Sequence, residues 1–167
     1  TSAKHGKRVQ ALGGAKNHML VLPDADLDLV ADSAVNAGFG SAGERCMAIS
    51  VVVAVEPVAD ALIPKITQRM QQIKVGDGRR SCDMGPLVTK QHRDKVASYI
   101  DIAASDGAEV VVDGGDVNPD GDGAGYWLGP TLIDRVPLSS KVYQEEIFGP
   151  VLSVVRVARY EGGLPLI

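Results

Sequence analysis

A nearly continuous apolar run, AISVVVAV at residues 48–55, constrains the fold of this chain more than any other segment, and Ser50 is its one polar residue. Its length and its β-branched residues are typical of a buried strand, and it is far shorter than the roughly 18 apolar residues that span a bilayer. Helix-like patterns stand on both sides of it, at residues 25–38 and 58–73. The run therefore predicts a strand between two helices, which favours an α/β fold.

The helix-like segments have apolar residues at helical spacing. In the first, Asp24 is the expected N-cap and Gly38 the expected end, and the apolar positions are Leu27, Val30, Ala31, Ala34 and Val35. The second carries Leu62, Ile63, Ile66, Met70 and Ile73 on one side. Thr89 starts a third helix, which carries Val96, Ile100 and Ala103.

Several other segments have the composition of short strands, namely residues 8–14, 18–22, 108–114, 130–136 and 150–157. Because strands alternate with helices, the sequence predicts a layered α/β fold with a largely parallel sheet and flanking helices. The length of 167 residues suits a single domain, and no internal boundary divides the chain.

Composition and charge narrow the possible partners. Hydrophobic residues make up 45% of the chain and charged residues 23%. The formal net charge is −4 without a basic run, which disfavours nucleic acid and membrane surfaces as partners.

Cys46 and Cys82 form neither a disulfide framework nor a C-x-x-C zinc pair, so we expect free thiols in a reducing compartment such as the cytoplasm. His5, His18 and His92 show no ligand spacing, and no sequence feature pairs one of them with a cysteine as in a Cys–His protease.

The segment GFGSAGERCMAIS carries two candidate chemistries. Gly38, Gly40 and Gly43 have the G-x-G-x-x-G spacing of a dinucleotide-binding turn. That turn follows a strand and opens a helix, whereas these glycines follow a helix and lead into a strand, so we interpret the spacing as coincidental. Cys46 stands beside Arg45, a cation that can favour a thiolate, and is either an activated nucleophile or a small buried hydrophobe.

The segment DVNPDGDGAGYW begins like a calcium-binding loop. The residues in suggestive places are Asp116, Asn118, Asp120, Gly121 and Asp122. The last position of such a loop should be a bidentate glutamate but is Trp127, and a strand precedes the segment where a helix should. We therefore expect a turn-rich hairpin loop and no metal site.

The stretch FGSAGERCMAIS resembles the cysteine signature of the aldehyde dehydrogenase superfamily, with Phe39, Gly43, Glu44, a variable Arg45 and the nucleophile Cys46. A second mark of that superfamily, EEIFGPV, follows downstream in the expected order. Over residues 4–160, the stretches GKRVQALGGAKNH, PDADLD, GSAGERCMA and EIFGPVLSVVR resemble the acylating, coenzyme A-dependent branch that acts on methylmalonate semialdehyde.

The resemblance implies roles for individual residues. Cys46 would attack the aldehyde carbon. Glu146 and Phe148 match positions that hold the nicotinamide ribose and line the cofactor site, so NAD is the implied cofactor, and a carboxylate is a sound acceptor for ribose hydroxyls. Leu12 and Gly13 match the stretch whose backbone lies near the nicotinamide.

Arg45 has two possible partners. The resemblance implies that it binds the carboxylate of a semialdehyde acid, which suits the planar, bidentate guanidinium. The alternative is a salt bridge to a local glutamate or aspartate. The sequence leaves both open.

The chain departs from hydrolytic aldehyde dehydrogenases at Ala11, where they carry the glutamate that activates water. Alanine cannot transfer a proton and the amide of Gln10 is no base, so a thiol, coenzyme A, is the implied acceptor of the acyl group. The implied reaction is NAD-dependent oxidation of methylmalonate or malonate semialdehyde to propionyl-CoA or acetyl-CoA, with loss of CO₂, through a thioester on Cys46. The alternatives are a hydrolytic enzyme with another base, a decayed pseudo-enzyme, and a non-catalytic fragment or scaffold with an inert thiol.

The chain has no initiator Met and stops without a final element, so both ends look cut. The resemblance implies that residues 1–167 are one catalytic-domain fragment, with the N-terminal NAD-binding domain and the C-terminal remainder outside it. We expect this fragment alone to be inactive. The full-length protein is expected to be a cytoplasmic homo-oligomer, a dimer or tetramer, whose partner is a small-molecule semialdehyde.

Overall fold

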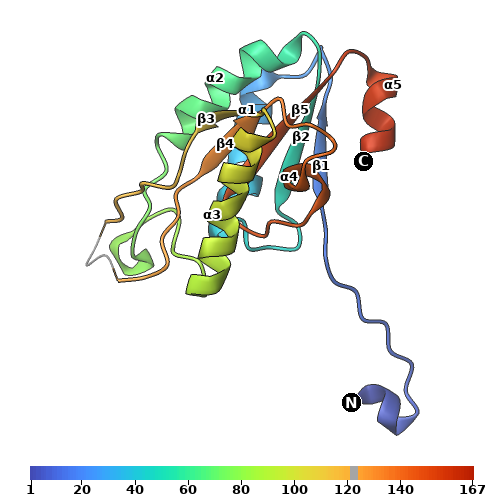
Figure 1. The fold of residues 1–167 in the computed structure, drawn as a ribbon, viewed down its shortest axis with the longest axis vertical. Coiled ribbons are helices and arrows are strands. Elements are labelled where there is room, and N and C mark those ends of the chain that lie inside the picture. The colour runs from blue at the N-terminus through green and yellow to red at the C-terminus, as the bar shows by residue number, and fades with distance from the viewer. Residues whose placement is uncertain (121–123) are drawn as a thin grey trace.

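A computed structural model describes residues 1–120 and 124–167, which form a five-stranded sheet in the order β1-β2-β5-β4-β3 (Figure 1). The strands are β1 (Asn17–Val21), β2 (Ile49–Val55), β3 (Glu109–Val112), β4 (Thr131–Asp134) and β5 (Val151–Val157). Neighbouring strands are parallel except for β3, which is antiparallel to β4. The predicted α/β fold with a largely parallel sheet is confirmed.

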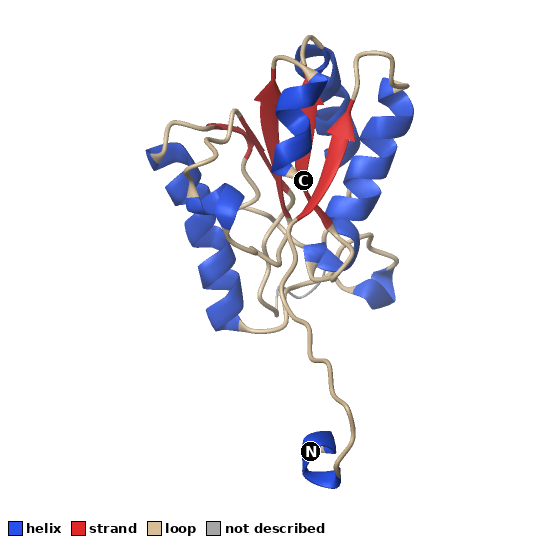
Figure 2. Cartoon of the chain, turned by 90° about the vertical axis from the view of Figure 1, so that its right-hand side faces the viewer, coloured by secondary structure: helices blue, strands red, loops and turns tan. Residues whose placement is uncertain are grey.

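Helices cover both faces of the sheet, with α3 on one face and α1 and α2 on the other (Figures 1 and 2). The helices are α1 (Leu27–Phe39), α2 (Val58–Met70), α3 (Lys90–Ser105), and the short α4 (Lys141–Gln144) and α5 (Tyr160–Gly163). The short 3₁₀ helices are η1 (Ser2–His5), η2 (Gly40–Gly43), η3 (Gly78–Arg80) and η4 (Leu164–Leu166). The predicted second helix thus ends at Met70 instead of Ile73.

Strand β2 is the buried strand that the apolar run predicts. Val51, Val52, Val53 and Ala54 are all 0% exposed, because β1 and β5 pair with both edges of β2 and helices cover its faces. Full burial of a valine side chain contributes roughly 1.5–3 kcal/mol, so this strand is a main source of core stability. The predicted helix faces are also buried, through Ala31, Ala34 and Val35 of α1, Leu62, Ile66 and Met70 of α2, and Val96, Ile100 and Ala103 of α3.

The boundaries of α1 differ from the prediction at both ends. Asp26, not Asp24, is the N-cap, and its Oδ1 accepts hydrogen bonds from the backbone N–H of Asp28 at 3.0 Å and of Leu29 at 3.2 Å. Gly38 does not end the helix but is buried inside it. The chain turns into the left-handed region only beyond the helix, from Ser41 to Gly43. At the start of α3, by contrast, the Thr89 hydroxyl caps the helix as expected.

The predicted strand at residues 8–14 is wrong. These residues form no strand and are exposed, and Figure 1 shows the segment extending away from the sheet towards the N-terminus. Leu12 is 85% exposed. An extended segment becomes a strand only when a neighbour takes up its backbone hydrogen bonds, and no strand of the described residues pairs with this one.

Residues 113–130 connect the antiparallel strands β3 and β4, in agreement with the expected hairpin connection. Gly121 and Asp122 of the calcium-like pattern lie outside the described residues. In residues 1–120 and 124–167, no three His, Cys, Asp or Glu side chains come together in a way that could hold a metal ion. Over the same residues no helix combines the length and apolarity needed to cross a membrane.

Candidate active site

The cysteine motif lies in the connection between α1 and β2, and it touches the EIFGP segment. Ser41, Ala42 and Gly43 have positive φ angles of 53°, 54° and 71°. A Cβ atom built on Gly43 would lie 2.2 Å from the carbonyl oxygen of Gly149, so only glycine allows this approach. Two motifs that are far apart in the sequence therefore pack backbone against backbone. The glycines follow a helix and precede a strand, which is not the setting of a dinucleotide-binding turn.

Cys46 is exposed and free, at the far end of this connection. Its carbonyl oxygen accepts a hydrogen bond from Nδ2 of Asn17 at 2.8 Å, and the same nitrogen donates to the carbonyl of Ala48 at 2.8 Å. The start of β1 thus holds the backbone that carries the thiol. Cys82 is also free but partly buried, in a loop before α3.

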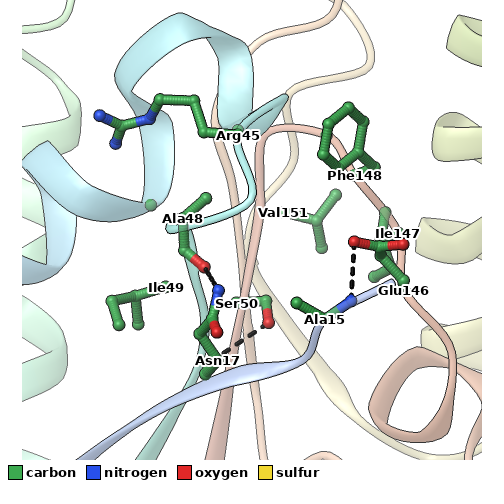
Figure 3. Close-up of a pocket in the computed structure, with 13 residues that line it drawn as sticks. Ala15, Asn17, Arg45, Ala48, Ile49, Ser50, Glu146, Ile147, Phe148 and Val151 are labelled. Atoms are coloured by element: carbon green, nitrogen blue, oxygen red, sulfur yellow. Dashed lines mark hydrogen bonds between the residues drawn. The ribbon is translucent and has the colours of Figure 1, made fainter. Parts of the chain in front are cut away.

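Glu146 lies opposite the start of β1. Its Oε1 accepts a hydrogen bond from the backbone N–H of Ala15 at 3.0 Å (Figure 3). Oε2 has no hydrogen-bond partner among the residues that the structure describes. The carboxylate is therefore anchored through one oxygen and can accept further hydrogen bonds through the other.

Lys16, the residue before β1, binds the segment that precedes Glu146. Its Nζ donates to the carbonyl oxygens of Val142 and Glu145, both at 2.7 Å. Burial lowers the pKa of Lys16 to about 8 and outweighs the opposite effect of the nearby Glu146 and Glu145 carboxylates. On the other side, Tyr99 of α3 donates its hydroxyl hydrogen to Oε2 of Glu145 at 2.6 Å, and burial together with this bond raises the pKa of Tyr99 to about 12.

Phe148 has a strained backbone and a partly exposed ring. Its φ is 57°, in the left-handed region that non-glycine residues rarely adopt, and its exposed fraction is 37%. His92 of α3 supports this conformation, because its Nε2 lies 2.7 Å from the carbonyl oxygen of Phe148. The same nitrogen lies 3.5 Å from Oε1 of Glu44, which belongs to the cysteine motif. His92 therefore bridges the two motifs.

These residues surround one pocket, shown in Figure 3. Its lining includes Ala15, Asn17, Arg45, Glu146, Phe148 and Val151. Of the residues proposed from sequence, the pocket thus brings together Arg45, Glu146 and Phe148. Cys46 adjoins the pocket through its neighbour Arg45, while Leu12 and Gly13 lie on the exposed N-terminal segment outside it.

The Arg45 guanidinium forms no ion pair with a carboxylate in the described part of the chain, so the expectation of a local salt bridge is wrong. Its Nη2 donates to the carbonyl oxygens of Asn36 at 3.1 Å and Ala37 at 2.9 Å, and caps the C-terminal end of α1. A Cβ atom on Gly40 would lie 2.7 Å from Nη2, so Gly40 leaves room for the guanidinium. Figure 3 shows the guanidinium directed away from Phe148 and Glu146.

Sequence reasoning missed three residues of the site, Asn17, Lys16 and His92. Asn17 and Lys16 stand in the quoted stretch GKRVQALGGAKNH, but an amide and a lysine carry no signal of a catalytic role. The partners of His92 are Phe148 and Glu44, which are distant in the chain, so no local spacing could have found them.

Comparison with known proteins agrees with this arrangement. The sequence model of the aldehyde dehydrogenase family matches residues 1–165. The chain is 53% identical to malonate-semialdehyde dehydrogenase of Pseudomonas aeruginosa, over 98% of this chain and 33% of that protein. It is 48% identical to malonate-semialdehyde dehydrogenase of Halalkalibacterium halodurans, over 99% of this chain and 34% of that protein. The chain therefore spans about a third of the length of the curated relatives that it matches.

Solved structures show the same likeness in three dimensions. Methylmalonate-semialdehyde dehydrogenase from Oceanimonas doudoroffii superposes with a TM-score of 0.94 at 51% identity, over 99% of this chain and 34% of that chain. A Sinorhizobium meliloti protein solved in complex with NAD gives a TM-score of 0.92 at 48% identity, over 98% of this chain and 34% of its own. With the family match over nearly its whole length, the chain belongs to the aldehyde dehydrogenase family.

Proposed function

We propose that this chain is the catalytic-domain part of an NAD-dependent, coenzyme A-acylating semialdehyde dehydrogenase, with Cys46 as its nucleophile. The observation that carries the proposal is the close approach of Gly43 to Gly149, which puts the loop that carries the exposed Cys46 beside the pocket that Arg45, Glu146 and Phe148 line. The names of the relatives support methylmalonate or malonate semialdehyde as substrate.

The residues present fit an NAD site. Glu146 has an oxygen without a partner among the described residues, which suits the hydroxyl groups of a ribose, and the Phe148 ring lines the same pocket. NAD, when bound, takes up a hydride from the substrate. The relative solved with NAD supports this choice of cofactor. Leu12 and Gly13 are proposed to approach the nicotinamide once the exposed segment has its partner.

In the proposed mechanism the Cys46 thiolate attacks the aldehyde carbon and forms a thiohemiacetal. After hydride loss this becomes a thioester on Cys46. Ala11 provides no base to activate water, so the thiol of coenzyme A takes the acyl group and releases the Cys46 thiolate. For a β-carboxylated acyl group, the C–C bond to the carboxylate breaks, CO₂ leaves, and the carbonyl receives the electron pair before the α-carbon takes up a proton.

Coenzyme A dependence tests the proposal most directly. In the protein at the full length of its relatives, methylmalonate semialdehyde with NAD and coenzyme A should give propionyl-CoA, CO₂ and NADH. Without coenzyme A it should give little free acid. Equal formation of free acid without coenzyme A would instead support a hydrolytic enzyme. Cys46→Ser should abolish both products, since a serine hydroxyl is a far weaker nucleophile at neutral pH than a thiolate.

Thiol labelling separates the enzyme from an inert fragment. An activated Cys46 should react with iodoacetamide faster than Cys82 and with its own pH profile. Because Cys46 is also the more exposed thiol, the rates are compared with those in the urea-unfolded chain, where exposure is equal. If the ratio of the Cys46 rate to the Cys82 rate in the folded chain exceeds that in the unfolded chain by no more than the difference in exposure explains, the non-catalytic alternative is favoured.

The remaining parts of the proposal concern the whole protein. We propose that the cofactor-binding domain and the rest of the fold belong to segments outside residues 1–167, that the assembled protein is a homo-oligomer, and that it works in the cytoplasm. Both cysteines are free, which is compatible with that compartment. Isothermal calorimetry on residues 1–167 should show weak or no NAD binding, and micromolar affinity would contradict the division into domains.

A further inference from the structure

The first residue of β1 reaches the loop of the proposed nucleophile. Nδ2 of Asn17 donates to the carbonyl oxygens of Cys46 and Ala48, both at 2.8 Å, and Figure 3 shows the amide pointing at Ala48. An amide nitrogen carries two hydrogens, so both are used here. Among the described residues, no other hydrogen bond reaches the carbonyl of Cys46. Within the described residues, the Asn17 amide is thus the one group that holds the Cys46 carbonyl, beside the local turn bond from the N–H of Ala48 to the carbonyl of Arg45 at 3.1 Å.

The two residues before Asn17 hold the other motif. The N–H of Ala15 binds Oε1 of Glu146 at 3.0 Å, and the ammonium of Lys16 binds the carbonyls of Val142 and Glu145 at 2.7 Å. Residues 15–17 therefore connect the nucleophile loop to the segment of Glu146. Three consecutive residues at the start of β1 thus contact both motifs, in addition to the close approach of Gly43 to Gly149.

We propose that Asn17 is a positioning residue for the Cys46 thiol, an inference that rests on the proposed role of Cys46 as nucleophile. Cys46 is exposed, so packing does not fix its side chain, and the direction of its Cα–Cβ bond depends on the backbone that Asn17 holds. A displacement of about 1 Å at a reacting group can cost roughly 100-fold in rate, so one lost anchor at this place is measurable.

Asn17→Asp is the sharpest variant, because it keeps the shape of the side chain and replaces the nitrogen that carries both N–H donors by an oxygen that faces the two carbonyl oxygens. Asn118→Asp is the matched control, since it makes the same chemical change at an exposed loop residue away from both motifs. Asn17→Ala removes the donors without adding charge. Each variant is measured for thermal unfolding, for iodoacetamide labelling of both cysteines between pH 6 and pH 10, and for aldehyde oxidation in the full-length protein.

For Asn17→Asp we expect labelling of Cys46 to be about tenfold slower at pH 7, with a profile displaced to higher pH, because an added negative charge disfavours a thiolate. Labelling of Cys82 should be unchanged. In the full-length enzyme, kcat should fall about 10- to 100-fold while KM for NAD stays within about twofold. A merely structural role would instead accelerate labelling of both cysteines and lower the unfolding temperature.

Wild-type labelling and kcat in Asn17→Asp would overturn the inference. If that variant does not fold, Asn17→Ala replaces it in the test. We expect its kcat to fall about tenfold at unchanged KM for NAD, and a wild-type kcat would contradict the inference. Cys46→Ser, run in parallel, separates this inference from the proposed function. Normal oxidation by Cys46→Ser would remove the proposed function itself, whereas an inactive Cys46→Ser beside a fully active Asn17→Asp would remove only the role of Asn17.

Discussion

The backbone of Gly43 lies so close to Gly149 that a Cβ atom on Gly43 would be 2.2 Å from the Gly149 carbonyl oxygen. Gly43 belongs to the cysteine motif and Gly149 to the EIFGP segment, and each lies next to an end of the strand pair β2–β5. This approach brings the loop of the Cys46 thiol next to the pocket that the Glu146 carboxylate lines, although the two motifs are distant in the chain.

Gly43→Ala should destabilise the fold by about 2–4 kcal/mol, because the added methyl group meets a backbone carbonyl and a φ of +71° disfavours any L side chain. Urea unfolding of the chain measures the loss. Gly6→Ala is the control: its φ is +66° but nothing lies within 4 Å, so only the backbone penalty of about 1 kcal/mol applies. Equal losses in the two variants would show that the contact with Gly149 is unimportant.

Lys16 should make stability depend on pH in the alkaline range. Its folded-state pKa of about 8 is below the ordinary 10.5, so between these values the unfolded chain binds more protons than the folded one. Stability from this group therefore rises as pH increases from about 8 to 10.5, by up to about 1.4 kcal/mol per pH unit.

The measurement is the free energy of unfolding of the wild type minus that of Lys16→Met, at pH 7 and pH 10. We expect this difference to shift by about 2 kcal/mol in favour of the wild type at the higher pH. Subtracting the variant cancels groups common to both proteins, including the tyrosines, which at pH 10 are about half ionised in the unfolded chain. A difference that is independent of pH would show that Lys16 is not held as the structure has it.

Arg45→Gln tests whether this guanidinium also binds substrate. The loss of the two hydrogen bonds to the Asn36 and Ala37 carbonyls should cost about 1 kcal/mol of stability in any case. If Arg45 binds the substrate carboxylate, kcat/KM for methylmalonate semialdehyde should fall about 10- to 100-fold more than kcat/KM for propanal, which has no carboxylate. Equal falls for the two aldehydes would restrict Arg45 to capping α1.

Ala11→Glu should introduce hydrolysis. A carboxylate at this position supplies the missing base, and positioned bases contribute about 10²- to 10⁴-fold to proton transfer. In the full-length enzyme we expect at least about a tenfold rise in acid formed without coenzyme A. Ala11→Gln is the isosteric control, and it should not form the acid. Equal acid formation by both variants would mean that the carboxylate does not act as a base.

Much of the fold was readable from local patterns. The run at residues 48–55 predicted β2 because a strand that is buried on both faces is almost entirely apolar. The apolar spacing of α1, α2 and α3 marked the faces that they bury. The start of α3 at Thr89 was predicted correctly, because threonine favours the position before a helix, where its hydroxyl accepts a hydrogen bond from a backbone N–H of the first turn. The predicted start of α1 was wrong because Asp24 and Asp26 are both suitable N-cap residues, and the structure uses Asp26. The prediction of a strand at residues 8–14 was wrong because no strand among the described residues pairs with this exposed segment.

By itself the sequence determined which residues can carry chemistry, since a thiol, a carboxylate and a guanidinium differ in kind, and it determined the family through two motifs in order. Only the tertiary structure decided which groups meet. Asn17 holds the backbone of Cys46, His92 holds that of Phe148, and Arg45 caps α1. The physical reason is that a side chain specifies the bonds it can form but not its partner, and the partner is chosen by the order and register of the strands, which bring distant segments to the same edge of the sheet.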